Sequence, residues 1–290
     1  MKFIKMHGAG NDYIFVNCFE EQVKEPGKLA VQLSDRHFGI GGDGLILVKP
    51  PSGAVYVFKD KKNTLPDARM EIYNADGSRA EMCGNGIRCV AWLIFYYKKL
   101  ERNTVYIETD GAVLKEVHLS LKERQITSVT VNMGKPRLLA KQIPACINNS
   151  EKIINEKICA DGGEYEITCV NMGNPHCVIF TDDIKSFPIE RVGKMLESMT
   201  EYFPDRINVE AAECINEELC RMRVWERGSG ITLACGTGAC AVAVAGALCG
   251  RLKRSITAEL DGGRLEIEWN TGTDEVFMTG DVTEVFKGEI

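Results

Sequence analysis

Two short segments of the chain place a cysteine directly before a glycine-rich turn and a long apolar run. Met82–Cys89 reads MCGNGIRC, and Ala234–Cys240 reads ACGTGAC. A glycine-rich turn at the start of a helix presents backbone N–H groups whose partial positive charge lowers the pKa of a neighbouring thiol. It also lets a carboxylate approach the backbone closely. Cys83 and Cys235 are therefore candidate acid and base thiols beside a bound carboxylate.

Such a pair of thiols suits one type of reaction. A proton is removed from one face of a carbon next to a carboxylate and is returned from the other face. The N–H groups at the helix ends would stabilise the negative charge that develops on the carboxylate. One cysteine would act as a thiolate and the other as a thiol, with the roles exchanged in the reverse direction. The alternative interpretation is that both cysteines are structural.

Two other patterns could hold a cofactor or a metal. Gly39–Gly44 (GIGGDG) has the glycine spacing of a dinucleotide site, but it precedes the strand-like run Leu45–Val48. A dinucleotide site needs a strand before the glycines and a helix after them. The cysteines of the two glycine-rich segments enclose five and four residues, which fits no C-x-x-C zinc motif. We expect no nucleotide cofactor and no metal.

Composition excludes several other classes of protein. The chain has 290 residues, 44% of them hydrophobic, and a net charge of −6 with no dense basic block, so nucleic acid is not expected as a partner. Met1–Gly8 lacks the apolar core of a signal peptide, and no run of 18 apolar residues could span a membrane. We expect a cytoplasmic protein whose 12 cysteines are mostly free thiols.

The two halves of the chain resemble each other. Arg69–Cys83 (RMEIYNADGSRAEMC) and Arg221–Cys235 (RMRVWERGSGITLAC) align without a gap at an offset of 152 residues. His7–Phe15 and Met172–Phe180 share a second pattern, a Gly-Asn pair that leads into an apolar run. The same order of both patterns indicates a duplication. The length is also typical of two domains.

The hydrophobic pattern predicts an α+β fold of two pseudo-symmetric domains, each a curved, mainly antiparallel sheet wrapped around a central helix. The two central helices should be buried, because one is apolar nearly all round and the other consists of small residues. The predicted helices are 26–34, 84–98, 188–202 and 236–250. Alternating patterns predict strands at 104–108, 128–132, 163–168 and 264–269, and the polar centre of 57–67 predicts an extended hairpin.

Over nearly its whole length the chain resembles the diaminopimelate epimerase family. The motifs that carry the resemblance are Lys5–Tyr13, Arg36–Gly44, Tyr73–Ser78, Cys83–Cys89, Asn171–His176, Ile207–Glu210, Arg221–Gly228 and Ala234–Gly238. The resemblance implies a cofactor-free epimerase that interconverts LL- and meso-diaminopimelate for lysine and peptidoglycan synthesis. It further implies a homodimer with the site in the cleft between two domains. The first domain would be 1–131, completed by a returning strand at 279–290, and the second 132–278.

The resemblance also assigns roles to single residues. Cys83 and Cys235 match the acid/base pair. The cradle for the reacting carboxylate matches Gly84, Asn85, Gly236 and Thr237. The other substrate-binding positions match Asn11, Asn74, Asn174, Asn208, Glu226 and Arg227, and the positions that tune the thiols match His176 and Glu226. Gly44 stands where some members carry Gln, so it could offer the substrate only its backbone.

Two other functions remain open at this point. Another cofactor-independent racemase of the same fold, acting on proline or histidine, would share the cysteines and differ at the far end of the substrate. Trp225–Gly228 with Asn74 and Asn208 favours a substrate whose far end is polar and charged. A protein of another class would use Cys83 and Cys235 for thiol redox chemistry or for metal binding.

Overall fold

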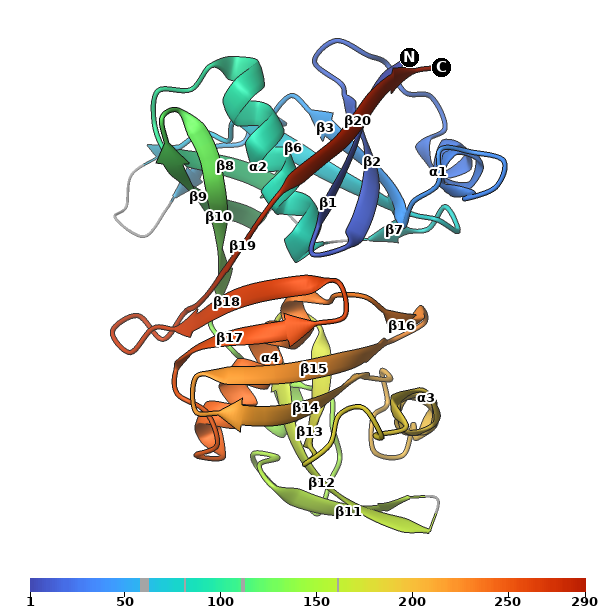
Figure 1. Cartoon of the computed structure of the whole chain (residues 1–290), viewed down its shortest axis with the longest axis vertical. Coiled ribbons are helices and arrows are strands. Elements are labelled where there is room, and N and C mark those ends of the chain that lie inside the picture. Colours follow the sequence, from blue (N-terminus) through green and yellow to red (C-terminus); the bar gives the residue numbers. More distant parts are fainter. Residues whose placement is uncertain (58–62, 81, 111–112, 161) are drawn as a thin grey trace. The chain divides into compact units, whose positions relative to one another are not determined.

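The chain folds into two compact units in the computed structural model, which describes residues 1–57, 63–80, 82–110, 113–160 and 162–290 (Figure 1). The first unit comprises Met1–Asn132 and Thr279–Ile290, and the second comprises Met133–Met278. Each unit is an α+β structure in which a mostly antiparallel sheet packs around one central helix. The fold class predicted from the sequence is confirmed.

In the first unit, the central helix α2 packs against strands from both halves of the sheet. Its helices are α1 (Pro26–Ser34) and α2 (Gly84–Lys98), and its strands are β1 (Lys2–Gly8), β2 (Asn11–Asn17), β3 (Gly44–Lys49), β4 (Tyr56–Val57), β5 (Asn63–Thr64), β6 (Ala68–Asn74), β7 (Arg79–Ala80), β8 (Thr104–Thr109), β9 (Val113–Lys122), β10 (Gln125–Gly134) and β20 (Thr283–Glu289). Strands β4 and β5 pair as the base of the predicted hairpin, whose centre lies outside the described residues.

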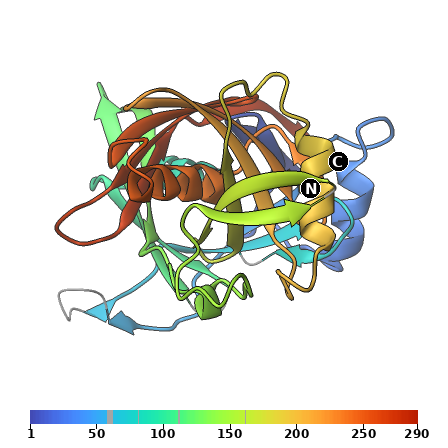
Figure 2. The same cartoon turned by 90° about the horizontal axis from the view of Figure 1, so that it is seen from below.

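The second unit repeats this plan around α4. Its helices are η1 (Ala140–Gln142, a short 3-10 helix), α3 (Ile189–Ser198) and α4 (Gly236–Leu248), and its strands are β11 (Glu156–Ala160), β12 (Gly163–Asn171), β13 (Pro175–Phe180), β14 (Asn208–Asn216), β15 (Leu219–Glu226), β16 (Gly230–Thr232), β17 (Ser255–Leu260), β18 (Gly263–Trp269) and β19 (Val276–Gly280). Helix α4 packs against β12, β13, β14, β17 and β18, and strands drawn in orange and red curve past it (Figure 2).

Strand pairing in the two units follows the same order. The first sheet runs β20-β1-β2-β3-β6-β8-β9-β10, with β2–β3 and β6–β8 parallel and the other pairs antiparallel. The second runs β11-β12-β13-β14-β15-β17-β18, with β13–β14 and β15–β17 parallel at the corresponding places. The short strands β7 and β16 add to β6 and β15. This match supports the internal duplication inferred from the sequence.

Both central helices begin at the cysteine-glycine motifs. Cys83 and Cys235 are the N-cap residues of α2 and α4, each with an extended backbone, and their side chains accept hydrogen bonds from the N–H groups of Gly86 and Gly238. A residue that accepts a bond from the first turn satisfies one of the N–H groups that a helix start leaves unpaired. Each sulfur atom is thereby held beside the first turn of its helix.

The predicted helices are confirmed, with one clear difference in length. Helix α2 covers the predicted residues, whereas α3 ends at Ser198 instead of Tyr202. After Ser198 the chain turns so that Phe203 becomes fully buried in the core of the second unit, with its N–H bonded to the Met199 carbonyl. Burial of this aromatic ring favours the turn over a longer helix.

Candidate active site

The predicted residues of the first unit lie at one edge of its sheet, in a group that we call the first cluster: Asn11, Gly44, Asn74, Cys83, Gly84 and Asn85. Asn11 begins β2, Gly44 begins β3 and Asn74 ends β6. Gly44 pairs with Asn74 across the antiparallel strands, so these strand ends coincide. The start of α2 supplies the remaining members.

Cys83 contacts two elements of the first cluster. Its thiol donates a hydrogen bond to Oδ1 of Asn11, at 3.3 Å, and its sulfur accepts one from the N–H of Gly86, also at 3.3 Å. The Asn85 side chain donates to the same Asn11 oxygen at 3.3 Å. Cys83 is half-buried. The structure thus joins three of the predicted site residues through one amide oxygen.

A charged network lies behind Asn11. Asp43 accepts a hydrogen bond from Nδ2 of Asn11 at 2.7 Å, and Arg36 bridges Asp43 and Asp12 at 2.9 and 2.7 Å. Burial acts to raise the pKa of Asp12, but hydrogen bonds from Arg36 and Lys5 hold it below its ordinary value. Burial and the Asp12 charge raise the pKa of Asp43. None of these charged residues was assigned a role from the sequence.

The predicted residues of the second unit form an equivalent group, the second cluster: Asn174, His176, Asn208, Glu226, Arg227, Cys235, Gly236 and Thr237. Asn174 precedes β13, Asn208 begins β14 and Glu226 ends β15, while the start of α4 supplies Cys235 and its neighbours. Because β13 and β14 are parallel to each other and β14 is antiparallel to β15, these strand ends meet at one edge of the sheet.

Cys235 is almost fully buried, with 6% of its surface exposed. Burial raises its pKa well above the ordinary value, and the negative charges of Glu226 and Glu210 raise it further. The hydroxyl of Thr237 and the N–H of Gly238 act in the opposite direction. Burial also raises the pKa of Glu226, whereas a hydrogen bond from Thr232 and the interaction with Cys235 lower it. Glu226 is thus a half-buried carboxylate that interacts with one of the two thiols.

A chain of three polar side chains, two of them fully buried, lies beside Cys235. Glu210 and His176 are both fully buried, and Oε1 of Glu210 lies 2.7 Å from Nδ1 of His176. Nε2 of His176 lies 3.0 Å from Oδ1 of Asn174. Gly238, in the first turn of α4, packs so close to this chain that an added Cβ would lie 2.7 Å from Oε1 of Glu210. The sequence motif contained Glu210, but nothing in its pattern indicated a buried carboxylate.

Arg227 and Asn208 are connected through the backbone. The N–H of Arg227 donates to Oδ1 of Asn208 at 2.9 Å, and Nδ2 of Asn208 donates to the Pro175 carbonyl at 2.8 Å. The Arg227 guanidinium donates to the Asp205 carbonyl at 2.7 Å. Asn208 therefore holds the Arg227 backbone in place, in addition to any contact with a substrate.

Gly44 is a position where only glycine fits the backbone. A Cβ at Gly44 would lie 2.2 Å from the carbonyl oxygen of Tyr73 and 2.9 Å from the Tyr13 ring. A glutamine here could not be accommodated without moving β6. The predicted contact of Gly44 with substrate stays a prediction. The Asn74 amide donates to Ser78 at 3.0 Å.

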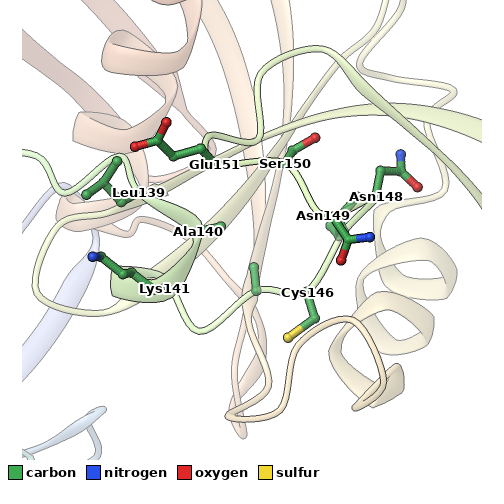
Figure 3. Close-up of a pocket in the computed structure, with 10 residues that line it drawn as sticks. Leu139, Ala140, Lys141, Cys146, Asn148, Asn149, Ser150 and Glu151 are labelled. Atoms are coloured by element: carbon green, nitrogen blue, oxygen red, sulfur yellow. The ribbon is translucent and has the colours of Figure 1, made fainter.

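Two features outside the clusters are the remaining cysteines and a pocket. All 12 cysteines are free, and burial raises the pKa of Cys89 to about 12, as expected for an inert helix-interior thiol. A pocket of the second unit is lined by residues 139–141 and 145–151, none of which belongs to either cluster (Figure 3).

The described residues show neither a metal-binding group nor a membrane-spanning helix. No group of three His, Cys, Asp or Glu side chains in the described ranges could hold a metal ion. Among the helices that the structure describes, none is long and apolar enough to cross a membrane.

Comparison with known proteins identifies the family. The sequence profile of the family described as diaminopimelate epimerase matches residues 3–139 and 168–285. Diaminopimelate epimerases of Acetivibrio thermocellus and Agathobacter rectalis are 46% and 45% identical over 100% of this chain, which covers 98% and 99% of their lengths. A solved structure described as a probable proline racemase from Agrobacterium radiobacter shares the fold at 12% identity, with a TM-score of 0.67 over 100% of this chain and 92% of that one. The chain therefore belongs to the diaminopimelate epimerase family.

Proposed function

We propose that the protein interconverts LL- and meso-diaminopimelate by inverting one α-carbon, with Cys83 and Cys235 as its two proton carriers. The observation that carries the proposal is the duplicated placement of the two cysteines. Each is the N-cap of a buried helix whose first turn is glycine-rich, at the same edge of the sheet in its unit. Inversion needs one proton donor and one acceptor on opposite faces of the α-carbon, and two equivalent thiols supply both.

The first turns of α2 and α4 are the proposed binding sites for the carboxylate next to the reacting carbon. Gly84, Asn85, Gly236 and Thr237 supply backbone N–H groups at the positive ends of two helices. As the α-proton leaves, negative charge grows on this carboxylate, and these N–H groups stabilise the transition state more than the ground state. The reaction then needs no electron-accepting cofactor.

Each inversion takes one proton from the substrate and returns one proton to it. The thiolate of one cysteine takes the α-proton and becomes a thiol, while the thiol of the other gives its proton to the opposite face and becomes a thiolate. The Cys83 thiol donates a hydrogen bond to Asn11, and the raised pKa of Cys235 favours its thiol form. Glu226, whose negative charge raises the pKa of Cys235, is the proposed acceptor of the Cys235 proton. His176, which lowers the pKa of Glu226, would act on the thiol through this carboxylate.

The far end of the substrate carries a second carboxylate and a second ammonium group. Arg227 is the proposed partner of that carboxylate, because a guanidinium binds a carboxylate through two parallel hydrogen bonds. The side chains of Asn11, Asn74, Asn174 and Asn208 are proposed to bind the remaining polar groups. Because Gly44 has no side chain, it could contact the substrate only through its carbonyl oxygen or its N–H.

The setting of the enzyme is also proposed. Twelve free cysteines suit a reducing compartment, which favours the cytoplasm. The family resemblance favours a homodimer. Synthesis of lysine and of peptidoglycan precursors is the corresponding role in the cell.

Two rivals make different predictions. A proline or histidine racemase would use the same cysteines, and the shared fold of the probable proline racemase does not separate the two at 12% identity. Arg227 argues against proline, which has no charged far end. A redox protein would cycle between a dithiol and a disulfide without altering any α-carbon.

The test is to incubate the reduced enzyme separately with LL-diaminopimelate, L-proline and L-histidine and to separate the stereoisomers by chiral chromatography. We expect meso-diaminopimelate and no D-proline or D-histidine. Cys83→Ser and Cys235→Ser should each lower kcat at least about 10³-fold. Cys146→Ser, which changes an exposed cysteine, should retain the wild-type rate. Inversion of proline or histidine alone would replace the proposed substrate, and no inversion of any of the three would favour the redox rival.

A further inference from the structure

We propose that Asp43 is a positioning residue that fixes the Asn11 amide so that its carbonyl oxygen accepts the thiol proton of Cys83. The inference rests on the proposed role of Cys83 in catalysis, and it adds a residue that holds this thiol in the proton-bearing state. Asp43 does not touch Cys83. It acts through the orientation of the side chain between them.

The direction of the Asn11 amide follows from the atoms on its two sides. Oδ2 of Asp43 lies 2.7 Å from Nδ2 of Asn11 and also accepts the Asp12 N–H at 3.0 Å. An ionised carboxylate only accepts hydrogen bonds, so the end of the amide that faces it must be the NH2 group. The carbonyl oxygen is therefore directed to the other side, toward Cys83 and Asn85.

Asp43 itself is held from several directions. Its second oxygen, Oδ1, accepts a hydrogen bond from Arg36 at 2.9 Å. Its N–H donates to the Asp12 carbonyl at 2.7 Å, and its carbonyl accepts the Ala75 N–H at 3.1 Å. Backbone bonds thus connect Asp43 to β2 on one side and to the turn after β6 on the other. The Arg36 guanidinium favours the ionised form of the carboxylate, which is the form that the Asn11 amide requires.

The contacts on the other side agree with this orientation. Oδ1 of Asn11 accepts from the Cys83 thiol and from Nδ2 of Asn85, both at 3.3 Å. If the amide were reversed, its NH2 group would face the NH2 group of Asn85, and its oxygen would face the Asp43 carboxylate. Both contacts would be repulsive. The charged network behind Asn11 consists of Asp12, Asp43, Lys5 and Arg36.

The consequence concerns the proton of Cys83. An acceptor directed at a thiol stabilises the protonated form, whereas the Gly86 N–H stabilises the thiolate. With Asp43 in place, the Asn11 oxygen adds an interaction that only the thiol can make. Asn174, the equivalent residue of the second unit, has its oxygen directed at His176 instead. An asparagine oxygen directed at the thiol is thus a feature of the first cluster.

The experiment measures the reactivity of Cys83 without substrate, so it does not depend on the proposed function. The intact enzyme is alkylated with iodoacetamide from pH 6 to pH 10, and modification of the Cys83 peptide is followed by mass spectrometry. Asp43→Asn can donate its own NH2 group to the Asn11 oxygen, which releases the amide to turn. We expect the pH midpoint of Cys83 alkylation to fall by about one unit, equivalent to the loss of one hydrogen bond. The exposed Cys146 peptide should be unchanged.

Two controls separate orientation from charge. Asp12→Asn removes an equal charge that does not contact the Asn11 side chain, and it should shift the Cys83 midpoint by less than half as much. In an Asn11→Ala background, Asp43→Asn should add no further shift. Equal shifts in Asp12→Asn and Asp43→Asn, or a full shift in the Asn11→Ala background, would overturn the proposal.

If Asp43→Asn does not fold, the Asn11→Ala variant tests the proposal by itself. Removal of the acceptor should itself lower the Cys83 midpoint, and an unchanged midpoint would overturn the proposal. Should the enzyme prove inactive on diaminopimelate while these shifts appear, only the proposed function fails. Activity with no shift would leave that function intact and overturn the role of Asp43.

Discussion

Glu197 links helix α3 to the turn that carries Arg227, and three hydrogen bonds determine how much stability its replacement should cost. Its carboxylate accepts hydrogen bonds from Nε1 of Trp225 at 2.6 Å, from the Gly228 N–H at 2.9 Å and from Arg206 at 3.0 Å. Only 8% of the Glu197 surface is exposed. The helix passes so close to β15 that a Cβ at Gly193 would lie 2.3 Å from the Cβ of Trp225.

Glu197→Ala removes both carboxylate oxygens and with them all three hydrogen bonds. The bond from the half-buried Trp225 ring is charge-assisted and contributes about 1.5 to 3 kcal/mol, and the Gly228 bond about 1 kcal/mol. The Arg206 side chain is 54% exposed, so its ion pair adds at most about 1 kcal/mol. We therefore expect a loss of about 2.5 to 5 kcal/mol in the free energy of unfolding. Glu197→Gln keeps one acceptor oxygen and should lose about half of this.

Urea unfolding of both variants measures this loss, with the exposed Glu201→Ala as a matched control that should stay within about 0.5 kcal/mol of wild type. Because the Arg227 turn is loosened, KM for diaminopimelate should rise about ten-fold while kcat changes less. A Glu197→Ala enzyme with wild-type stability and KM would refute the reasoning. A large fall in kcat at constant KM would place the role of Glu197 elsewhere.

Two further replacements test the clusters. Glu226→Gln removes a negative charge that raises the pKa of Cys235, so the pH midpoint of Cys235 alkylation should fall. Loss of the proposed proton acceptor should also lower kcat about 10²-fold. A rise in the alkylation midpoint would contradict this role of Glu226. Gly44→Gln should cost about 3 kcal/mol of stability in urea unfolding, because its Cβ would overlap the Tyr73 carbonyl. Gly272→Ala, whose Cβ meets only the Asn270 side chain at 3.4 Å, is its control, and equal stabilities of the two variants would argue against the overlap.

The elements whose position depends on local sequence were predictable. The start of α2 follows from its glycines and its end from the polar residues after the apolar run, and both ends were placed to the residue. The duplication was visible because the two cysteine segments align without a gap. The parallel pairing of β2 with β3, and of β13 with β14, was not predictable, since the alternation of a strand carries no information about the direction of its partner.

The candidate site was predictable only where a motif named the residue. Asp43 and Glu210 both lie inside motifs, yet nothing in the pattern distinguishes a carboxylate that orients a buried side chain from one in contact with solvent. Glu197 did carry a signal. It lies eight residues after Ile189, in the buried stripe of α3 with Val192 and Leu196, and an acid in an apolar stripe indicates a buried polar contact.

Inversion of one α-carbon by two thiols can be followed directly by proton NMR of the reduced enzyme with LL-diaminopimelate in D2O, because solvent deuterium replaces the α-proton at the inverted carbon. The account predicts that meso product carries deuterium at that carbon, and that inversion is lost in both Cys83→Ala and Cys235→Ala. Inversion at the wild-type rate in either variant, or meso product that retains its α-proton, would contradict it.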